Sequence, residues 1–167
     1  MIRIAGVFIV ILQLALVGPA SAEQVKVVEV FAGDLVAVQG DKGRTKIRLM
    51  GIDAPENARD EGDPGQPYSQ EATEYLAKLV LGKTVEIQSW GKDRYGQEFG
   101  VIFLGGENVN LKMVRSGLAE VYRGRMRKDF DENPYKAVEM EARHRQIGMW
   151  SIGNIYISPR VWRQRQR

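Results

Sequence analysis

The residues best suited to chemistry lie at one short corner of the chain. Arg48, Asp53 and Glu56 lie within nine residues there, and the mostly apolar run 49–52 separates Arg48 from the two acids. Pro55 fixes its own backbone and pushes Ala54 toward an extended conformation. The corner is therefore rigid, and its charged groups are held in place.

A second carboxylate comes from Asp34, which interrupts the first predicted strand pair within the segment Phe31-Ala32-Gly33-Asp34. Closure of a barrel could bring it beside Asp53. Carboxylates without cysteine or histidine partners select hard cations such as Ca²⁺, Mg²⁺ or Mn²⁺. The alternative is that each aspartate only caps a turn, the commoner role of a single Asp in a loop. His144, the single histidine, lies between two arginines, where a surface role is expected.

The elements that must position these residues follow from hydrophobic periodicity and turn residues. Five segments are predicted as strands: residues 24–30, 35–38, 44–52, 84–90 and 97–104. The first three form an antiparallel meander. A helix with apolar residues at helical spacing follows the loop 53–67, with Glu74 and Lys78 paired on its outer face and Gly82 at its end.

Two further helices complete the chain. A short one carries Leu111, Val114 and Leu118, and a longer one begins at Asn133-Pro134 and ends near Gly148, with Val138 inward and Glu139 outward. Three strands, a helix and two strands is the order of an OB-fold. We therefore predict an α+β, mainly β protein: a five-stranded OB-fold barrel with three helices.

The N-terminus resembles a secretory signal peptide. Arg3 precedes an apolar run, and Ala20-Ser21-Ala22 has the small residues of a cleavage site. We predict residues 1–22 as signal peptide and 23–167 as a single domain, exported to the periplasm or secreted, monomeric and without a membrane span after cleavage. The chain contains no cysteine, which excludes thiol catalysis, zinc–thiolate sites and iron–sulfur clusters.

Charge distribution is more informative than the formal net charge of +3. Basic residues cluster in two places: Arg123, Arg125, Arg127 and Lys128, and then Arg160, Arg163, Arg165 and Arg167. Such clusters suit a polyanion, although a charge run is as often only a solvated face. The sequence does not show which side of the fold the tail arginines occupy.

Five motifs occur in order and together resemble the staphylococcal nuclease (thermonuclease) family. They are Gly33-Asp34, the segment from Arg48 to Glu56, Gln66-Pro-Tyr-Ser-Gln-Glu71-Ala72, Asp93-Arg-Tyr-Gly96 and Val114-Arg-Ser-Gly117-Leu-Ala119. The resemblance covers roughly residues 25–150, nearly all of the predicted mature chain.

The resemblance implies a role for each matching residue. Asp34 and Asp53 match calcium-binding carboxylates, and the backbone carbonyl of Ala54 matches a third ligand. Glu56 matches a general base, and Arg48 matches one of two arginines that grip the scissile phosphate. Such a site hydrolyses the P–O5′ bond of single-stranded DNA or RNA with Ca²⁺ or another hard divalent cation.

The match is looser for five residues that lie where the family contacts nucleotides: Arg94, Tyr95, Tyr122, Arg123 and Arg125. Tyr122 either stacks on a base or packs in the core. Gln97 stands where the family has its second phosphate-binding arginine, and glutamine lacks the charge and the guanidinium fork. Ala32 and Leu35 replace oxygen-bearing residues near the predicted cation, which predicts weaker metal binding.

Three interpretations stay open at this point. The first is a functional nuclease, slowed or rescued by a neighbour such as Arg94. The second is a catalytically inactive domain that binds nucleic acid or another anionic partner. The third is an exported OB-type module for another anion or a protein partner, with a purely structural acidic corner. The enzyme is favoured because the four residues that match its site most closely are all present: Asp34, Arg48, Asp53 and Glu56.

Overall fold

The structure, a computed structural model, describes residues 23–41 and 43–166. The predicted signal peptide, residues 1–22, lies outside these residues. Within the described ranges, no helix has the length and apolar character needed to cross a bilayer.

The first three strands form the predicted antiparallel meander. They are β1 (Glu23–Ala32), β2 (Leu35–Gly40) and β3 (Gly43–Leu49). Val25 and Val27 of β1 are buried while Lys26 between them is exposed, as strand alternation requires. In β2 and β3, Leu35 pairs with Arg48, which places the end of β3 beside the turn that carries Asp34.

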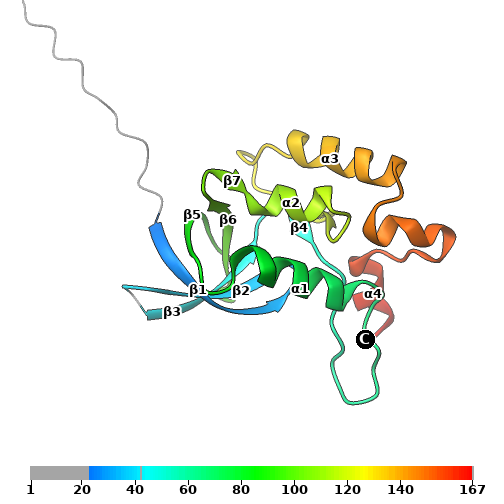
Figure 1. Cartoon of the computed structure of the whole chain (residues 1–167), viewed down its shortest axis with the longest axis horizontal. Coiled ribbons are helices and arrows are strands. Elements are labelled where there is room, and N and C mark those ends of the chain that lie inside the picture. Colours follow the sequence, from blue (N-terminus) through cyan, green and yellow to red (C-terminus); the bar gives the residue numbers. More distant parts are fainter. Residues whose placement is uncertain (1–22, 42, 167) are drawn as a thin grey trace, which may run out of the picture.

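Two later strands close the barrel. β5 (Thr84–Lys92) pairs antiparallel with β1 and with β6 (Glu98–Leu104), and β6 runs parallel to β3 with Arg48 opposite Phe99. The circuit β1–β2–β3–β6–β5 confirms the five-stranded OB-like barrel (Figure 1). The short β7 (Glu107–Asn108) pairs antiparallel with the end of β6, and β4 (Ile52–Asp53) pairs with β8 (Glu120–Val121).

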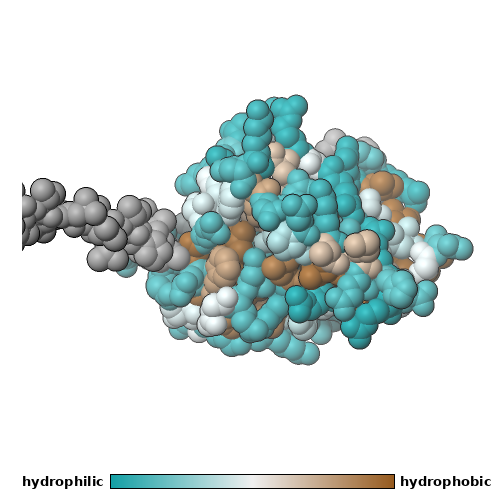
Figure 2. Space-filling view, turned by 90° about the horizontal axis from the view of Figure 1, so that it is seen from above, coloured by the Kyte–Doolittle hydropathy of each residue, from teal (hydrophilic) through white to brown (hydrophobic). Residues whose placement is uncertain are grey.

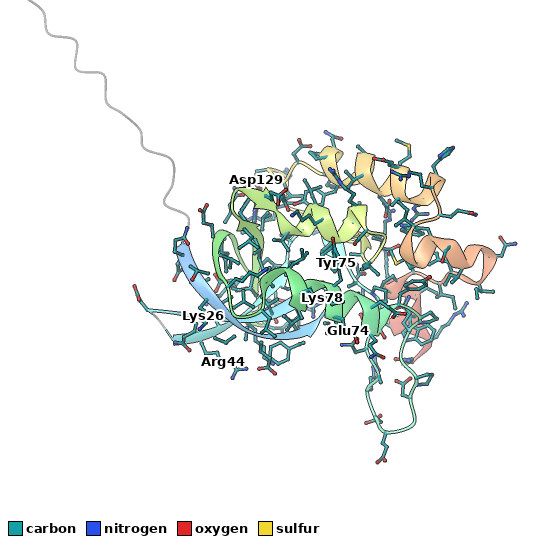
Figure 3. All side chains as sticks on the ribbon, in the orientation of Figure 1. Lys26, Arg44, Glu74, Tyr75, Lys78 and Asp129 are labelled. Atoms are coloured by element: carbon teal, nitrogen blue, oxygen red, sulfur yellow. The ribbon has the colours of Figure 1, made fainter. Side chains whose placement is uncertain are left out.

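The three predicted helices are present as α1 (Ser69–Val80), α2 (Val109–Arg115) and α3 (Asn133–His144). Tyr75 packs against the core from the α2 side of α1, and Glu74 and Lys78 lie exposed on the other side (Figure 3). The expected Glu74–Lys78 pair is not among the ion pairs of the described residues, and Glu74 accepts a hydrogen bond from Gln70. Over α2 and α3 the surface is mostly hydrophilic, with hydrophobic residues in separate groups (Figure 2).

One prediction for α3 is wrong. Glu139 is buried rather than outward, with 5% of its surface exposed. Its carboxylate accepts a hydrogen bond from the Val121 backbone N–H and pairs with Arg123 and Arg143. A carboxylate can be buried here because each oxygen has a donor.

The structure adds two elements to the three predicted helices. A 3₁₀ helix, η1 (Gly148–Ile155), follows α3, and α4 (Pro159–Arg165) ends the described chain. Ser158 caps α4 by accepting from Val161 N–H. Figure 1 shows α4 beside the loop between β4 and α1, and two hydrogen bonds join them: Gln66 to Ile157 and Arg59 to Gln166.

Candidate active site

Asp34 and Arg48 are brought together by the β1–β2 turn and the β2–β3 register. Arg48 donates a hydrogen bond of 2.8 Å to the Asp34 carboxylate. The backbone is pinned at the same place, because Leu49 N–H donates to the Asp34 carbonyl. Gly33 permits this turn, since a Cβ there would lie 2.7 Å from the Ala72 side chain and 2.9 Å from that of Ala54.

Asp53 is held by the short β4–β8 ladder, where it lies opposite Glu120. The segment that leads to Asp53 is held by Asn110, a fully buried residue. Asn110 accepts from Ile102 N–H at 3.1 Å and donates to the Met50 carbonyl at 2.9 Å and the Gly100 carbonyl at 3.2 Å. The corner that carries Asp53 is therefore attached to β6 through one side chain.

Glu56 is positioned by Gln66, which is also buried. The Gln66 side-chain oxygen accepts from Glu56 N–H, and Gln66 N–H donates back to the Glu56 carbonyl. The Gln66 side-chain amide donates to the Ile157 carbonyl at 2.6 Å. One residue thus couples the Glu56 segment to the C-terminal tail.

The tail places a residue in the site that sequence reasoning did not assign to it. Arg163 of α4 donates to both Asp53 oxygens, each at 2.8 Å, and to Glu56 at 2.5 Å. These hydrogen bonds raise the pKa of Arg163 above its usual value, against the effect of burial. The only sequence signal for this contact was the arginine-rich tail itself.

These groups line one pocket with a volume of about 540 Å³, within the usual size range of ligand sites. Its acidic residues are Asp34, Asp53, Glu56 and Asp93, and its basic residues are Arg48, Lys92, Arg125, Arg127 and Arg163. Opposite charges therefore converge in a single cleft, which also has apolar walls that include Trp90 and Phe99.

The other predicted site residues divide into two groups. Tyr122 and Arg125 line the pocket, and Tyr122 is exposed rather than in the core. The remaining ones are outside the pocket lining: Ala54, Gln97, Arg94, Tyr95 and Arg123. The Gln97 amide donates to the Lys46 and Glu98 carbonyls, Arg94 stacks on Tyr95, and Arg123 pairs with Glu139.

Burial raises the pKa of Asp34 to about 6. Arg48 and Arg163 lower it, while the negative charges of Asp53 and Glu56 raise it. Burial is the largest of these effects, so the raised pKa reflects the loss of water around the carboxyl more than the charges beside it.

This pKa predicts a stability gain for Asp34→Asn in the absence of divalent cations. The folded pKa lies above the unfolded value, so wild-type stability is fully present below pH 4 and decreases as pH rises through about 6. At pH 8 the variant should therefore be more stable by about 1–3 kcal/mol. Urea unfolding at pH 4, 6 and 8 measures this. A difference that does not grow with pH would contradict the burial of a charged Asp34.

The residues present fit a hard cation through two carboxylates. Asp34 and Asp53 are both buried and line the same pocket, and the bidentate Arg163 contact places a positive group at Asp53. In the described part of the chain no group of three or more His, Cys, Asp or Glu is arranged to hold a metal. A cation here would therefore need other oxygens, from backbone, water or substrate, to complete its ligands.

Glu120 is a third buried carboxylate, and it lies opposite Asp53 in the β4–β8 ladder. Burial raises its pKa, and the hydrogen bond from Tyr156, 2.5 Å long, lowers it. Tyr156 follows η1, so this contact attaches the tail near Asp53. The C-terminal segment is thus fixed at two consecutive residues, by the hydrogen bond from Tyr156 to Glu120 and by that from Gln66 to Ile157.

Comparison with known proteins agrees with this geometry. Residues 46–152 match the family described as staphylococcal nuclease homologue. An uncharacterized endonuclease of Escherichia coli O157:H7 is 36% identical over 143 residues, which cover 84% of this chain and 85% of that relative. A probable endonuclease LCL3 of Pyricularia oryzae is 35% identical over 131 residues, 74% of this chain and 51% of that protein. With its barrel, its acidic corner and these relatives, the chain belongs to the staphylococcal nuclease family.

Proposed function

We propose that this protein is a divalent-cation-dependent nuclease that hydrolyses phosphodiester bonds in DNA or RNA. One observation carries the proposal: Asp34, Arg48, Asp53 and Glu56, from three different segments, converge in one pocket with basic residues at its walls. Relatives named endonucleases support the same reaction class.

The chemistry of the proposed reaction matches these side chains. Hydrolysis forms a bond from a water oxygen to phosphorus and breaks the P–O5′ bond, and the 5′ oxygen takes a proton from solvent, which balances the proton removed from the attacking water. Glu56 accepts the proton of the attacking water. Arg48 donates hydrogen bonds to the phosphate oxygens, where negative charge gathers. A cation held by Asp34 and Asp53, with the Ala54 carbonyl, would supply further charge stabilisation at these oxygens.

Further proposals concern substrate and location. Tyr122 is exposed at the pocket and can stack on a base, which favours a single-stranded substrate. We propose Ca²⁺ as the physiological cation, and export on the basis of the signal-like residues 1–22. Mass spectrometry of the N-terminus in the periplasm and the medium tests export, and a mature chain that still begins at Met1 would contradict it.

The proposed function predicts that a chelator abolishes cleavage. Denatured DNA should be digested in Ca²⁺ at a rate at least about 100-fold above that in chelator, because charge stabilisation at the phosphate is lost with the cation. Ca²⁺ should also stabilise the fold, by about 2.7 kcal/mol at 100 times its dissociation constant.

Matched variants separate the cation site from general charge effects. Asp53→Asn should lose both cleavage and Ca²⁺-dependent stabilisation, while Asp60→Asn, in the exposed part of the same loop, should keep both. Cleavage that persists in chelator would argue against cation dependence. Salt-sensitive binding of oligonucleotides without cleavage would favour the alternative, an inactive domain that binds nucleic acid.

A further inference from the structure

Arg163 occupies a position that its sequence neighbourhood does not explain. Its guanidinium contacts Asp53 through both terminal nitrogens and Glu56 through one of them. The partners are 110 and 107 residues away along the chain. Of the Arg163 side chain, 29% is exposed, toward the same pocket that Arg48 and Tyr122 line.

The anchoring of α4 keeps this guanidinium at the pocket whatever its partner. Pro159 is buried, and Arg160 donates to the Arg123 carbonyl at 3.0 Å. The amide of Gln66 holds the Ile157 carbonyl, and Trp162 lines a small apolar cavity with Met149 and Tyr156. The helix backbone is thus fixed by several contacts that do not involve Arg163, and the arginine side chain can change its partner without the helix moving.

The contacts of Arg163 are incompatible with the proposed catalytic state. Glu56 cannot readily accept a proton while a guanidinium holds its oxygen, and a cation at Asp53 would repel the guanidinium. Once displaced, the partly buried guanidinium of an anchored helix needs another acceptor. The phosphodiester is the anion that the pocket would then contain, and two parallel N–H donors match two phosphate oxygens.

We propose that Arg163 is a catalytic residue that moves from Asp53 and Glu56 to the substrate phosphate when cation and nucleic acid bind. It is a second phosphate-binding arginine beside Arg48, supplied by the C-terminal helix, and it keeps the carboxylates paired when the site is empty of substrate. This inference rests on the proposed nuclease function and adds a residue to it.

The proposal predicts opposite effects of Arg163→Ala on cleavage and on cation binding. The kcat/KM for denatured DNA should fall about 100-fold, the usual effect of losing a transition-state donor. Ca²⁺ affinity without nucleic acid, measured by calorimetry, should rise about fivefold, because the competing guanidinium is gone. Binding of an uncleavable phosphorothioate oligonucleotide in Ca²⁺ should weaken about tenfold. Arg163→Lys should be intermediate, since it keeps the charge but not the fork.

Arg165→Ala is the matched control. It removes the same charge from an exposed position of the same helix, and it should leave kcat/KM and Ca²⁺ affinity unchanged. Thermal unfolding of each variant shows whether it is folded.

The remaining outcomes separate this proposal from others. Faster cleavage by Arg163→Ala together with tighter Ca²⁺ binding would show that Arg163 inhibits the enzyme by occupying the carboxylates. This result would overturn the proposal. A fall in both quantities would indicate a structural role, and no change would remove Arg163 from the site. If the wild type binds the phosphorothioate oligonucleotide but cleaves nothing, the proposed function fails. The effect of Arg163→Ala on binding of this oligonucleotide then decides alone whether Arg163 binds phosphate. If the wild type neither binds nor cleaves, both proposals fail.

Discussion

Replacing Glu56 with glutamine is expected to lower kcat for denatured DNA by about 10²–10⁴, the range by which a positioned proton acceptor accelerates a reaction. Glutamine has nearly the same shape and can still accept a hydrogen bond from Arg163, but it cannot take a proton from water. Because the Glu56 backbone, not its side chain, is bonded to Gln66, the loop should keep its position. Initial rates at saturating Ca²⁺ and substrate measure the effect.

Glu61→Gln is the control for this experiment. Glu61 lies in the same loop and is exposed, so the substitution makes the same change of charge away from the pocket. It should retain wild-type kcat. Ca²⁺ affinity of Glu56→Gln should stay close to that of the wild type, since Asp34 and Asp53 remain. A Glu56→Gln protein with more than a tenth of wild-type activity would show that another group accepts the proton.

The second large effect is on stability. Asn110→Ala should lower the free energy of unfolding by about 3–5 kcal/mol, because it leaves the Ile102 N–H and the Met50 carbonyl without a partner in the core. Each such buried group costs about 1–3 kcal/mol. Since Met50 leads into the corner that carries Asp53, Ca²⁺ affinity of the folded variant should also fall. Urea unfolding and Ca²⁺ titration measure the two effects.

Asn108→Ala provides the comparison, at the N-cap of the helix that carries Asn110 and with the same atoms removed. Asn108 caps α2 by accepting from Leu111 N–H and donates to Tyr135. Its loss should cost about 1 kcal/mol, as is typical of an N-cap, because its groups are only half-buried. Equal destabilisation by the two variants would mean that the corner does not depend on Asn110.

Local signals were sufficient for most of the barrel. Alternation of apolar and polar residues located β1, which has one face in the core and one in solvent. Runs between turn residues located β2, β3, β5 and β6, although β2 and β6 bury consecutive residues. Local signals were also sufficient to single out Arg48, Asp53 and Glu56, because these residues lie close together at a corner that a proline makes rigid. Asp34 was found from its place in the turn between the first two strands. The strand register then joined these segments, as the Leu35–Arg48 pairing shows.

Burial of polar side chains was not predictable in this way. Glu139 has the periodicity of an exposed position, yet it is buried because Val121 and Arg123 supply donors from another element. Asn110 and Gln66 read as ordinary polar residues in the sequence, and their roles depend on carbonyl and N–H groups of segments far along the chain. A polar residue enters the core only when such partners meet it there, and periodicity carries no information about them.

The sequence by itself therefore determined the barrel, the acidic corner and the kind of ligand that its residue types prefer. Only the tertiary structure decided that α4 returns to the pocket and that Arg163, rather than Gln97 or Arg94, presents a guanidinium to Asp53 and Glu56. The physical reason is the separation of 110 residues between Arg163 and Asp53. Propensity and periodicity act over a few neighbouring residues, whereas this contact depends on the packing of Pro159, Trp162 and Gln66 that holds the tail against the β4–α1 loop.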